Sequence, residues 1–145
     1  MKIEIIKIGK CRHPGISQVA EEYLKRLQAF ATVESSLWKE SLAKTKIPKL
    51  FSPENFVVCL DERGQQFSSI TLSTNLQKWV NNSSLKRIVF VIGGPYGLSD
   101  SERKKAQRVW SLSQCTLPSD LSWLIVCEQL YRAFTILKGM AYHHE

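Results

Sequence analysis

Short apolar runs alternate along this chain with longer segments in which apolar residues recur at helical spacing. The runs 3–8, 55–60 and 86–92 ("IEIIKI", "NFVVCL" and "KRIVFVI") predict buried strands, and "ATVESSLWKE" predicts another. Helical spacing predicts a helix from Pro14, one over 70–80 capped by Ser68 or Ser69, and a long one from Pro118 that stops at Gly139. Strands that alternate with helices predict an α/β fold with a mostly parallel sheet flanked by helices.

Four segments have a weaker pattern. Residues 39–54 contain several lysines and two prolines, so we expect a loop with at most one helical turn. "DERGQQFSS" (61–69) is expected to be a polar loop. Ser99 and Glu102 have capping-box spacing, which predicts a helix from there to about Trp110. "SLSQCTL" (111–117) is then expected to be a final short strand.

The stretch "VFVIGGPYGLSD" (89–100) runs from a buried strand directly into two glycines. Glycine permits either a tight turn or the close approach of a ligand to the backbone, and both interpretations stay open at this point. The stretch lacks the lysine and Ser/Thr of a P-loop and does not match GxGxxG, which argues against a nucleoside triphosphate or a dinucleotide. Ligands of open parallel sheets bind at the carboxyl ends of strands, where "LDERG" and "SLSQCTLP" are also expected. Three loops could therefore converge on one ligand.

Composition narrows the function only partly. The 145 residues suffice for one domain, and the net charge of +7 favours a polyanionic partner such as nucleic acid without establishing one. The four cysteines and three histidines form no CxxC or zinc pattern, so we expect reduced thiols and no metal. The first ten residues alternate like a strand and do not resemble a signal peptide, and no apolar run has the roughly 20 residues of a membrane helix. These features predict a soluble, cytoplasmic protein.

Five motifs occur in an order that identifies a family. "LDERGQQFSS", "FVIGGPYGLS", "SLSQCTLP", "EQLYRAFTILKG" and "AYHHE" resemble the RlmH group of the SPOUT superfamily of S-adenosylmethionine-dependent RNA methyltransferases, and the resemblance spans nearly the whole chain. It implies a single SPOUT domain over 1–145, with a C-terminal trefoil knot within about 86–145. It further implies a homodimer, S-adenosylmethionine as methyl donor without a metal, and N3-methylation of a pseudouridine in 23S ribosomal RNA, in the ribosome or its large subunit.

The resemblance also assigns the site residues. The donor-binding positions of the family correspond here to Leu60, Gly94, Ser113, Gln114, Cys115, Thr116, Leu117 and Pro118. Leu60 and Leu117 have plain core packing as their alternative. His143 is the candidate acceptor of the proton from N3, with Tyr142 orienting the base, whereas chain ends are more often frayed surface tails. Arg132 lies four residues after Glu128, so a structural ion pair competes with a role in RNA binding.

The chain departs from the family at three positions. His144 stands where the family usually has a basic residue, mostly Arg, and Ser119 and Trp123 stand where it often has His and Arg. These changes affect the expected RNA side of the site and leave an alternative function: a catalytically impaired SPOUT-fold protein that binds the ribosome or assists its assembly. The last helix is rich in large apolar residues, including Trp123, which predicts that it forms the homodimer interface.

Overall fold

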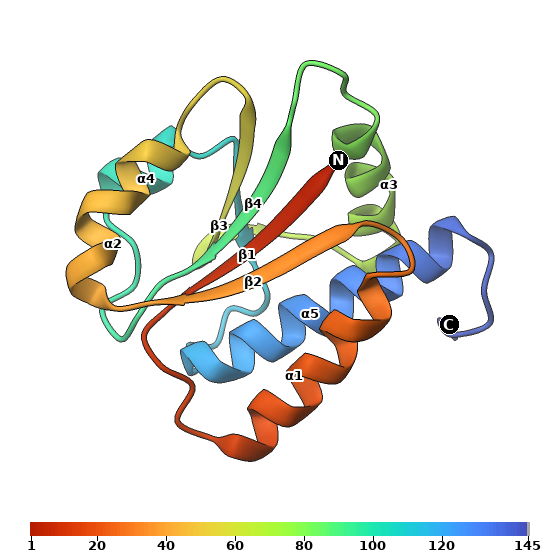
Figure 1. Cartoon of the computed structure of the whole chain (residues 1–145), viewed down its shortest axis with the longest axis horizontal. Helices are drawn as coiled ribbons and strands as arrows, with labels where there is room; N and C mark the ends of the chain where they lie inside the picture. Colours follow the sequence, from red (N-terminus) through yellow and green to blue (C-terminus); the bar gives the residue numbers. More distant parts are fainter. Residues whose placement is uncertain (145) are drawn as a thin grey trace.

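Five parallel strands form the sheet, in the order β2-β1-β4-β3-β5 (Figure 1). The computed structural model describes residues 1–144, so Glu145, the last residue of the expected tail, lies outside the described residues. The strands are β1 (Lys2–Ile8), β2 (Thr32–Trp38), β3 (Asn55–Gln66), β4 (Arg87–Ile92) and β5 (Arg108–Ser111). Each adjacent pair is parallel, which confirms the predicted α/β fold with a parallel sheet.

Helices cover both faces of this sheet, and the strands are accordingly apolar on both sides. The helices α1 (Pro14–Leu27), α3 (Ser69–Val80) and α5 (Ser119–Leu137) lie on one face (Figure 1). The other face is covered by α2 (Glu40–Lys46), the 3-10 helix η1 (Ile47–Leu50) and α4 (Asp100–Lys105). In β4, Phe90 packs into the first cluster and its neighbours Val89 and Val91 into the second, since successive strand residues point to opposite faces.

The segment 39–54, predicted to be a loop, is mostly helical instead. Ala43, Ile47 and Leu50 are buried at i, i+4 and i+7, the spacing of one helical face, and they pack on the sheet. The lysines between them are exposed. The prediction was wrong because it weighed the lysines and prolines above the apolar period of this segment.

The expected elements around residues 61–117 also need correction. β3 continues to Gln66 through part of the expected polar loop, with an irregularity between Leu60 and Gln65. The helix that begins at the Ser99 capping box ends at Lys105, well before Trp110. The last strand is Arg108–Ser111, and residues 112–118 are a loop. Val109 and Trp110 are residues that favour strands, and their pairing with β3 places them in one, whereas the prediction had extended the helix from Ser99 through them.

The start of α5 is tied to the end of β1 by a buried ion pair. The Lys7 ammonium, 1% exposed, lies 2.9 Å from Asp120 Oδ1 and donates to the carbonyls of Gly9 and Lys10. Asp120 Oδ2 accepts from the backbone N–H of Arg12 and from His13 Nδ1. Burial alone would raise the pKa of Asp120, but these hydrogen bonds and the Lys7 charge outweigh it, so the pKa lies well below its ordinary value.

Trp123 was expected to lie on an outer surface of the last helix, in a dimer interface, but its side chain is buried. Its side chain is 3% exposed, belongs to the main core cluster, and donates from Nε1 to Ser35 Oγ at 3.0 Å. The large apolar residues of α5 pack against the sheet, α1 and α3 of the same chain. Most of the apolar surface of α5 is therefore buried within one chain, although Leu121 is 38% exposed, and it does not by itself indicate a second copy.

Candidate functional site

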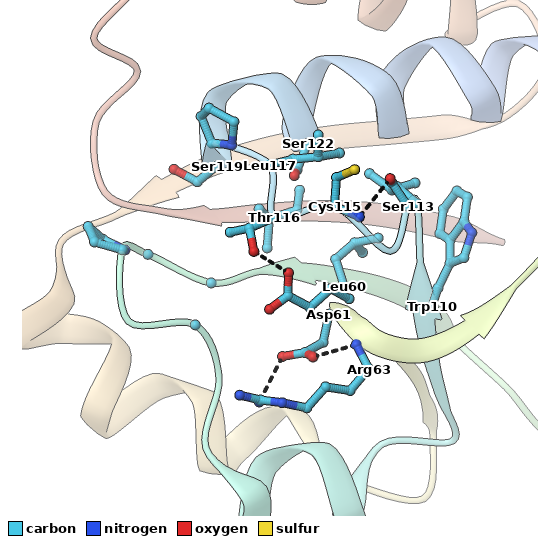
Figure 2. A pocket seen from close by; sticks show the side chains of 18 of the residues that line it. Leu60, Asp61, Arg63, Trp110, Ser113, Cys115, Thr116, Leu117, Ser119 and Ser122 are labelled. Carbon is cyan, nitrogen blue, oxygen red and sulfur yellow. Dashed lines mark hydrogen bonds and ion pairs between the residues drawn. The ribbon is translucent and has the colours of Figure 1, made fainter.

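A cavity of about 480 Å³ opens at the carboxyl ends of β3, β4 and β5 (Figure 2). Its wall includes Ile92 and Trp110, near the ends of β4 and β5, and Leu60, which pairs with both of them and directly precedes the irregular part of β3. The glycine loop after β4 and the loop that precedes α5 complete it. The glycine loop, the loop before α5 and the irregular segment of β3, where the sequence predicted a third loop, thus converge on one cavity at this edge of the sheet.

The glycine loop is both a tight turn and a wall of the cavity. Gly97 N–H donates to the Gly94 carbonyl at 2.9 Å, with Pro95 at the second position of the turn and Gly97 at a φ of +70°. A Cβ on Gly93 would lie 2.8 Å from the Gly97 carbonyl carbon, which cannot move aside easily. A Cβ on Gly94 would collide with the carboxylate of Glu40, a side chain that can move. Gly93 is thus required by the turn.

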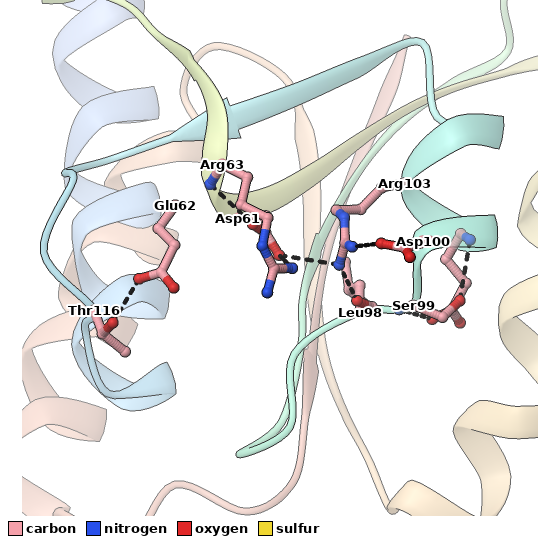
Figure 3. A network of polar contacts seen from close by, with 9 residues as sticks. Asp61, Glu62, Arg63, Leu98, Ser99, Asp100, Arg103 and Thr116 are labelled. Carbon is pink, nitrogen blue, oxygen red and sulfur yellow. Dashed lines mark hydrogen bonds and ion pairs between the residues drawn. The ribbon is translucent and has the colours of Figure 1, made fainter.

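The irregular part of β3 places charged side chains at the cavity. The pairing of β3 with β5 is interrupted between Leu60 and Gln65. Where the chain returns to β5, Gly64 lies so close to the Val109 carbonyl that a Cβ would not fit. Asp61 accepts from the Arg63 backbone N–H at 2.9 Å and lies 3.4 Å from the Arg103 guanidinium (Figure 3). Since Arg103 also donates to the Leu98 carbonyl, Asp61 connects β3 to the end of the glycine loop.

The loop 112–118 is held by its own hydroxyl groups. Ser111 Oγ donates to the Ser113 carbonyl at 2.8 Å, and the Cys115 N–H donates to Ser113 Oγ at 3.0 Å. Thr116 Oγ1 donates to Glu62 Oε2 at 2.6 Å, which connects this loop to the irregular segment of β3 (Figure 3). These bonds fix the backbone that faces the cavity.

Most of the expected donor-binding residues lie together. The cavity is lined by Leu60, Gly94, Ser113, Cys115, Thr116, Leu117 and Pro118. Gln114 is exposed and is not among the residues that line the cavity. The sequence reasoning did not select Asp61, Arg63, Tyr96 or Trp110, which also line it. Asp61 and Arg63 could have been selected from the sequence, because they are charged residues that directly follow a buried apolar run.

The expected catalytic tail lies at the other end of α5. Ser119 and Ser122, in the first turn of α5, line the cavity, whereas Tyr142 and His143 follow its last turn. A helix of 19 residues is about 27 Å long, so the tail does not reach the cavity of its own chain. Tyr142 is nevertheless anchored: its hydroxyl lies 3.2 Å from that of Tyr23, and its ring meets Tyr131 edge-on at 4.8 Å.

Arg132 connects the tail to α5. Its guanidinium forms the expected i,i+4 ion pair with Glu128 at 3.0 Å, lies 4.8 Å from the centre of the Tyr142 ring, and lies 3.1 Å from His143 Nδ1. Because a guanidinium only donates, His143 Nδ1 is the acceptor and a neutral ring then has its proton on Nε2. In this arrangement His143 has no lone pair available to take a proton from a substrate.

The remaining titratable groups do not suggest a second reactive centre. Burial raises the pKa of the Cys59 and Cys127 thiols to about 12, so both stay protonated and unreactive near neutral pH. Within residues 1–144, no three His, Cys, Asp or Glu side chains are grouped so that they could hold a metal ion. None of the described helices is long and apolar enough to cross a membrane.

The fold and the cavity define a class: a parallel α/β domain that binds a small molecule at the carboxyl edge of its sheet. The family described as "Predicted SPOUT methyltransferase" matches residues 1–143, and the chain belongs to that family. A protein named "Ribosomal RNA large subunit methyltransferase H" from Christiangramia forsetii is 40% identical over 99% of both chains. Its namesake from Maridesulfovibrio salexigens is 35% identical over 99% of this chain and 98% of its own.

Solved structures agree on the fold. A probable methyltransferase from Bordetella pertussis superposes with a TM-score of 0.59 at 12% identity, covering 90% of this chain and 93% of its own. A putative methylase family protein from Neisseria gonorrhoeae gives 0.55 at 15% identity, covering 99% of this chain and 86% of its own. At these identities the likeness concerns the fold alone.

Proposed function

We propose that this protein transfers a methyl group from S-adenosylmethionine to N3 of a pseudouridine in 23S ribosomal RNA. The observation that carries the proposal is the single cavity assembled from the three motif loops of the chain. Full-length relatives named for methylation of large-subunit ribosomal RNA, at 35% and 40% identity, support the substrate class. The net charge of +7 suits a polyanionic substrate.

The residues present fit the proposed methyl donor. A volume of about 480 Å³ lies within the range of small-molecule sites, about 300–1,000 Å³. Leu60 and Leu117 offer apolar surface to the adenine, while Gly94 and the backbone of 113–118 offer polar groups without intervening bulk. The carboxylate of Glu62, whose partner is the neutral Thr116 hydroxyl, suits a ligand with positive charge, whereas Asp61 is already paired with Arg63 and Arg103. S-adenosylmethionine, when bound, supplies a methyl group on a positively charged sulfur, which is a good leaving group.

The acceptor nitrogen must lose its proton as the new bond to carbon forms. A neutral imidazole is suited to take that proton near neutral pH, and we assign this role to His143, with Tyr142 orienting the base. His143 can act only after its Nδ1 leaves Arg132, because that contact occupies the lone pair of the ring. The tail must therefore take up a second position during the reaction.

A second copy of the chain follows from this assignment. The tail follows the last turn of α5, while the cavity lies at the first turn, so His143 can serve only the cavity of another protomer. A two-fold homodimer places each tail near the partner's cavity if the protomers are antiparallel along α5. The proposed enzyme is then an obligate dimer with composite sites.

The remaining features of the proposal concern topology and location. The family implies a trefoil knot within about residues 86–145, where the chain runs from β4 through the glycine loop, β5 and α5. The proposed place of action is the cytoplasm, on the ribosome or its large subunit.

Mass mapping of ribosomal RNA tests the proposal directly. In cells that lack this protein, one pseudouridine of 23S RNA should lose 14 mass units, the mass of one CH₂, and the purified protein with labelled S-adenosylmethionine should restore it. If the protein binds the donor and the ribosome but transfers no label, the alternative function suggested by the change at His144 is correct: a catalytically impaired protein that binds the ribosome. An unchanged RNA mass in the deletion strain excludes the proposed activity.

A further inference from the structure

Tyr96 stands out among the aromatic residues of the chain. Its side chain is 93% exposed, although it lines the cavity. Within residues 1–144, every other aromatic side chain is buried or half-buried. An aromatic ring left in water at the rim of a ligand cavity is a feature that the folded chain alone does not explain.

The backbone holds this ring in a defined place. Tyr96 is the third residue of the turn closed by Gly97 N–H and the Gly94 carbonyl, and Pro95 fixes the φ of the second. The turn is followed by Leu98, which is 4% exposed in the core on the α2 side of the sheet. Arg103 donates to the Leu98 carbonyl and pairs with Asp61, so the loop is attached on its far side too (Figure 3).

The charge near the loop indicates what covers the ring. The sheet face beside the glycine loop is covered by α2, η1 and α4. Their six basic residues, Arg103 and the exposed Lys44, Lys46, Lys49, Lys104 and Lys105, outnumber their three acidic ones, Glu40, Asp100 and Glu102. The helices α1, α3 and α5 on the opposite face contain Glu21, Glu22, Asp120 and Glu128 against Lys25, Arg26, Lys78 and Arg132, so their charges balance. Basic charge beside an exposed aromatic ring is the combination that binds unpaired nucleotides.

We propose that Tyr96 stacks on a nucleobase of the RNA substrate at the mouth of the donor cavity and so positions the RNA for methyl transfer. This inference rests on the proposed function and deepens it by assigning a substrate contact to the glycine loop. A flat ring provides a surface for any base, so the contact contributes affinity rather than sequence preference. The exposed lysines nearby contribute attraction for the phosphates.

The test compares Tyr96→Ala with Tyr96→Phe, which keeps the ring. The substrate is the large subunit purified from cells that lack this protein, and label transfer is followed as subunit concentration is varied. We expect Tyr96→Ala to raise KM for the subunit at least about tenfold, or 1.4 kcal/mol, with kcat within a few-fold of wild type. Tyr96→Phe should behave as wild type. Ile70→Ala removes a comparably apolar side chain, 42% exposed on α3, and should leave both constants unchanged.

Calorimetry with S-adenosylmethionine and light scattering complete the experiment. Unchanged donor affinity and an unchanged oligomeric state in Tyr96→Ala, together with the higher KM, support the stacking role. A tenfold loss of donor affinity shows instead that Tyr96 covers the donor, and dissociation of the protein shows that it contacts a second copy; either result overturns the inference. A wild-type protein that transfers no label contradicts the proposed function, whereas an active wild type with an unaffected Tyr96→Ala contradicts only the stacking role.

Discussion

At the scale of single residues, Lys7 and Asp120 form the most consequential polar contact outside the cavity. Both are nearly inaccessible to water, at 1% and 5% exposure. A buried charge that loses its partner is left without compensation, so we expect Asp120→Asn to lower the free energy of unfolding by about 3–5 kcal/mol. Urea denaturation followed by tryptophan fluorescence measures this loss.

Two controls and a pH series complete that experiment. Glu34→Gln disrupts the exposed Lys2–Glu34 pair at 3.1 Å and should cost at most about 1 kcal/mol. The double variant Lys7→Met/Asp120→Leu should recover most of the loss, because an apolar pair needs no counter-charge. Since the pKa of Asp120 is lowered in the fold, its contribution is fully present above the ordinary value of 3.8. It declines progressively as the pH falls from there toward the lowered pKa of the folded state. An Asp120→Asn effect that is equally large at pH 2.5 would contradict this account.

Gly94 allows a second prediction at this scale. A valine there must displace the Glu40 carboxylate and approach Ile8, and it disturbs the turn that borders the cavity. We expect Gly94→Val to fold but to bind S-adenosylmethionine at least about tenfold more weakly, or 1.4 kcal/mol. Calorimetry measures the affinity. Gly15→Val is the matched control, because a Cβ at Gly15 meets no atom within 4 Å.

Combining Gly94→Val with Glu40→Ala locates the cause of the loss. If the collision with Glu40 moves the loop, the double variant should regain part of the affinity. If the valine side chain itself occupies space that the donor needs, Glu40→Ala has no effect. Gly94→Val with wild-type affinity would remove Gly94 from the donor site.

At the scale of elements, the tail and the donor loops should have separable roles. Deleting residues 142–145 should abolish methyl transfer and leave donor affinity within a few-fold of wild type, since the described tail residues 142–144 do not line the cavity. His143→Ala should lower the rate by about a hundredfold or more, the usual effect of a lost general base. His144→Arg should be tolerated, or should tighten RNA binding by adding a permanent charge.

Tyr142→Phe is the control for the anchored position of the tail. It keeps the ring beside Tyr131 and Arg132 but removes the hydroxyl that meets Tyr23 and Glu128. If Tyr142→Phe transfers methyl groups at a near-normal rate and the truncated protein does not, the loss in the truncated protein comes from a missing contact of the tail with the substrate. It does not come from lost packing of the tail within one chain. A truncated protein that methylates ribosomes at the normal rate would show that the tail is not catalytic.

At the scale of the whole molecule, the composite site predicts complementation between two inactive variants. Gly94→Val retains its tail but has a damaged cavity, and the tail deletion retains its cavity. After unfolding and refolding of an equal mixture, half of the dimers are mixed and each has one complete site of two, so about a quarter of wild-type activity should return. Light scattering should show a dimer in every sample. A stable monomer near the chain mass of 16.6 kDa, or no recovery in the mixture, would contradict the composite site.

Local patterns predicted the regular elements well and the irregular ones poorly. The apolar run before Gly93 and the Ser99–Glu102 capping box were confirmed because each depends on neighbouring residues alone. The strand Arg108–Ser111 was missed because its partner β3 lies about fifty residues away. The helical segment after Lys39 was missed although its apolar period was present in the sequence.

The sequence by itself determined the parallel α/β class, the loops that follow β4 and β5 and, through five ordered motifs, the family. These depend on residue type and order. Only the tertiary structure decided that Gln114 does not line the cavity, that Asp61 and Tyr96 border it, and that Trp123 is core. It also placed His143 on Arg132, at the end of α5 away from the cavity. Such facts depend on which distant segments meet in the fold. The spacing of residues along the chain does not specify which of them lie close enough to contact the same ligand.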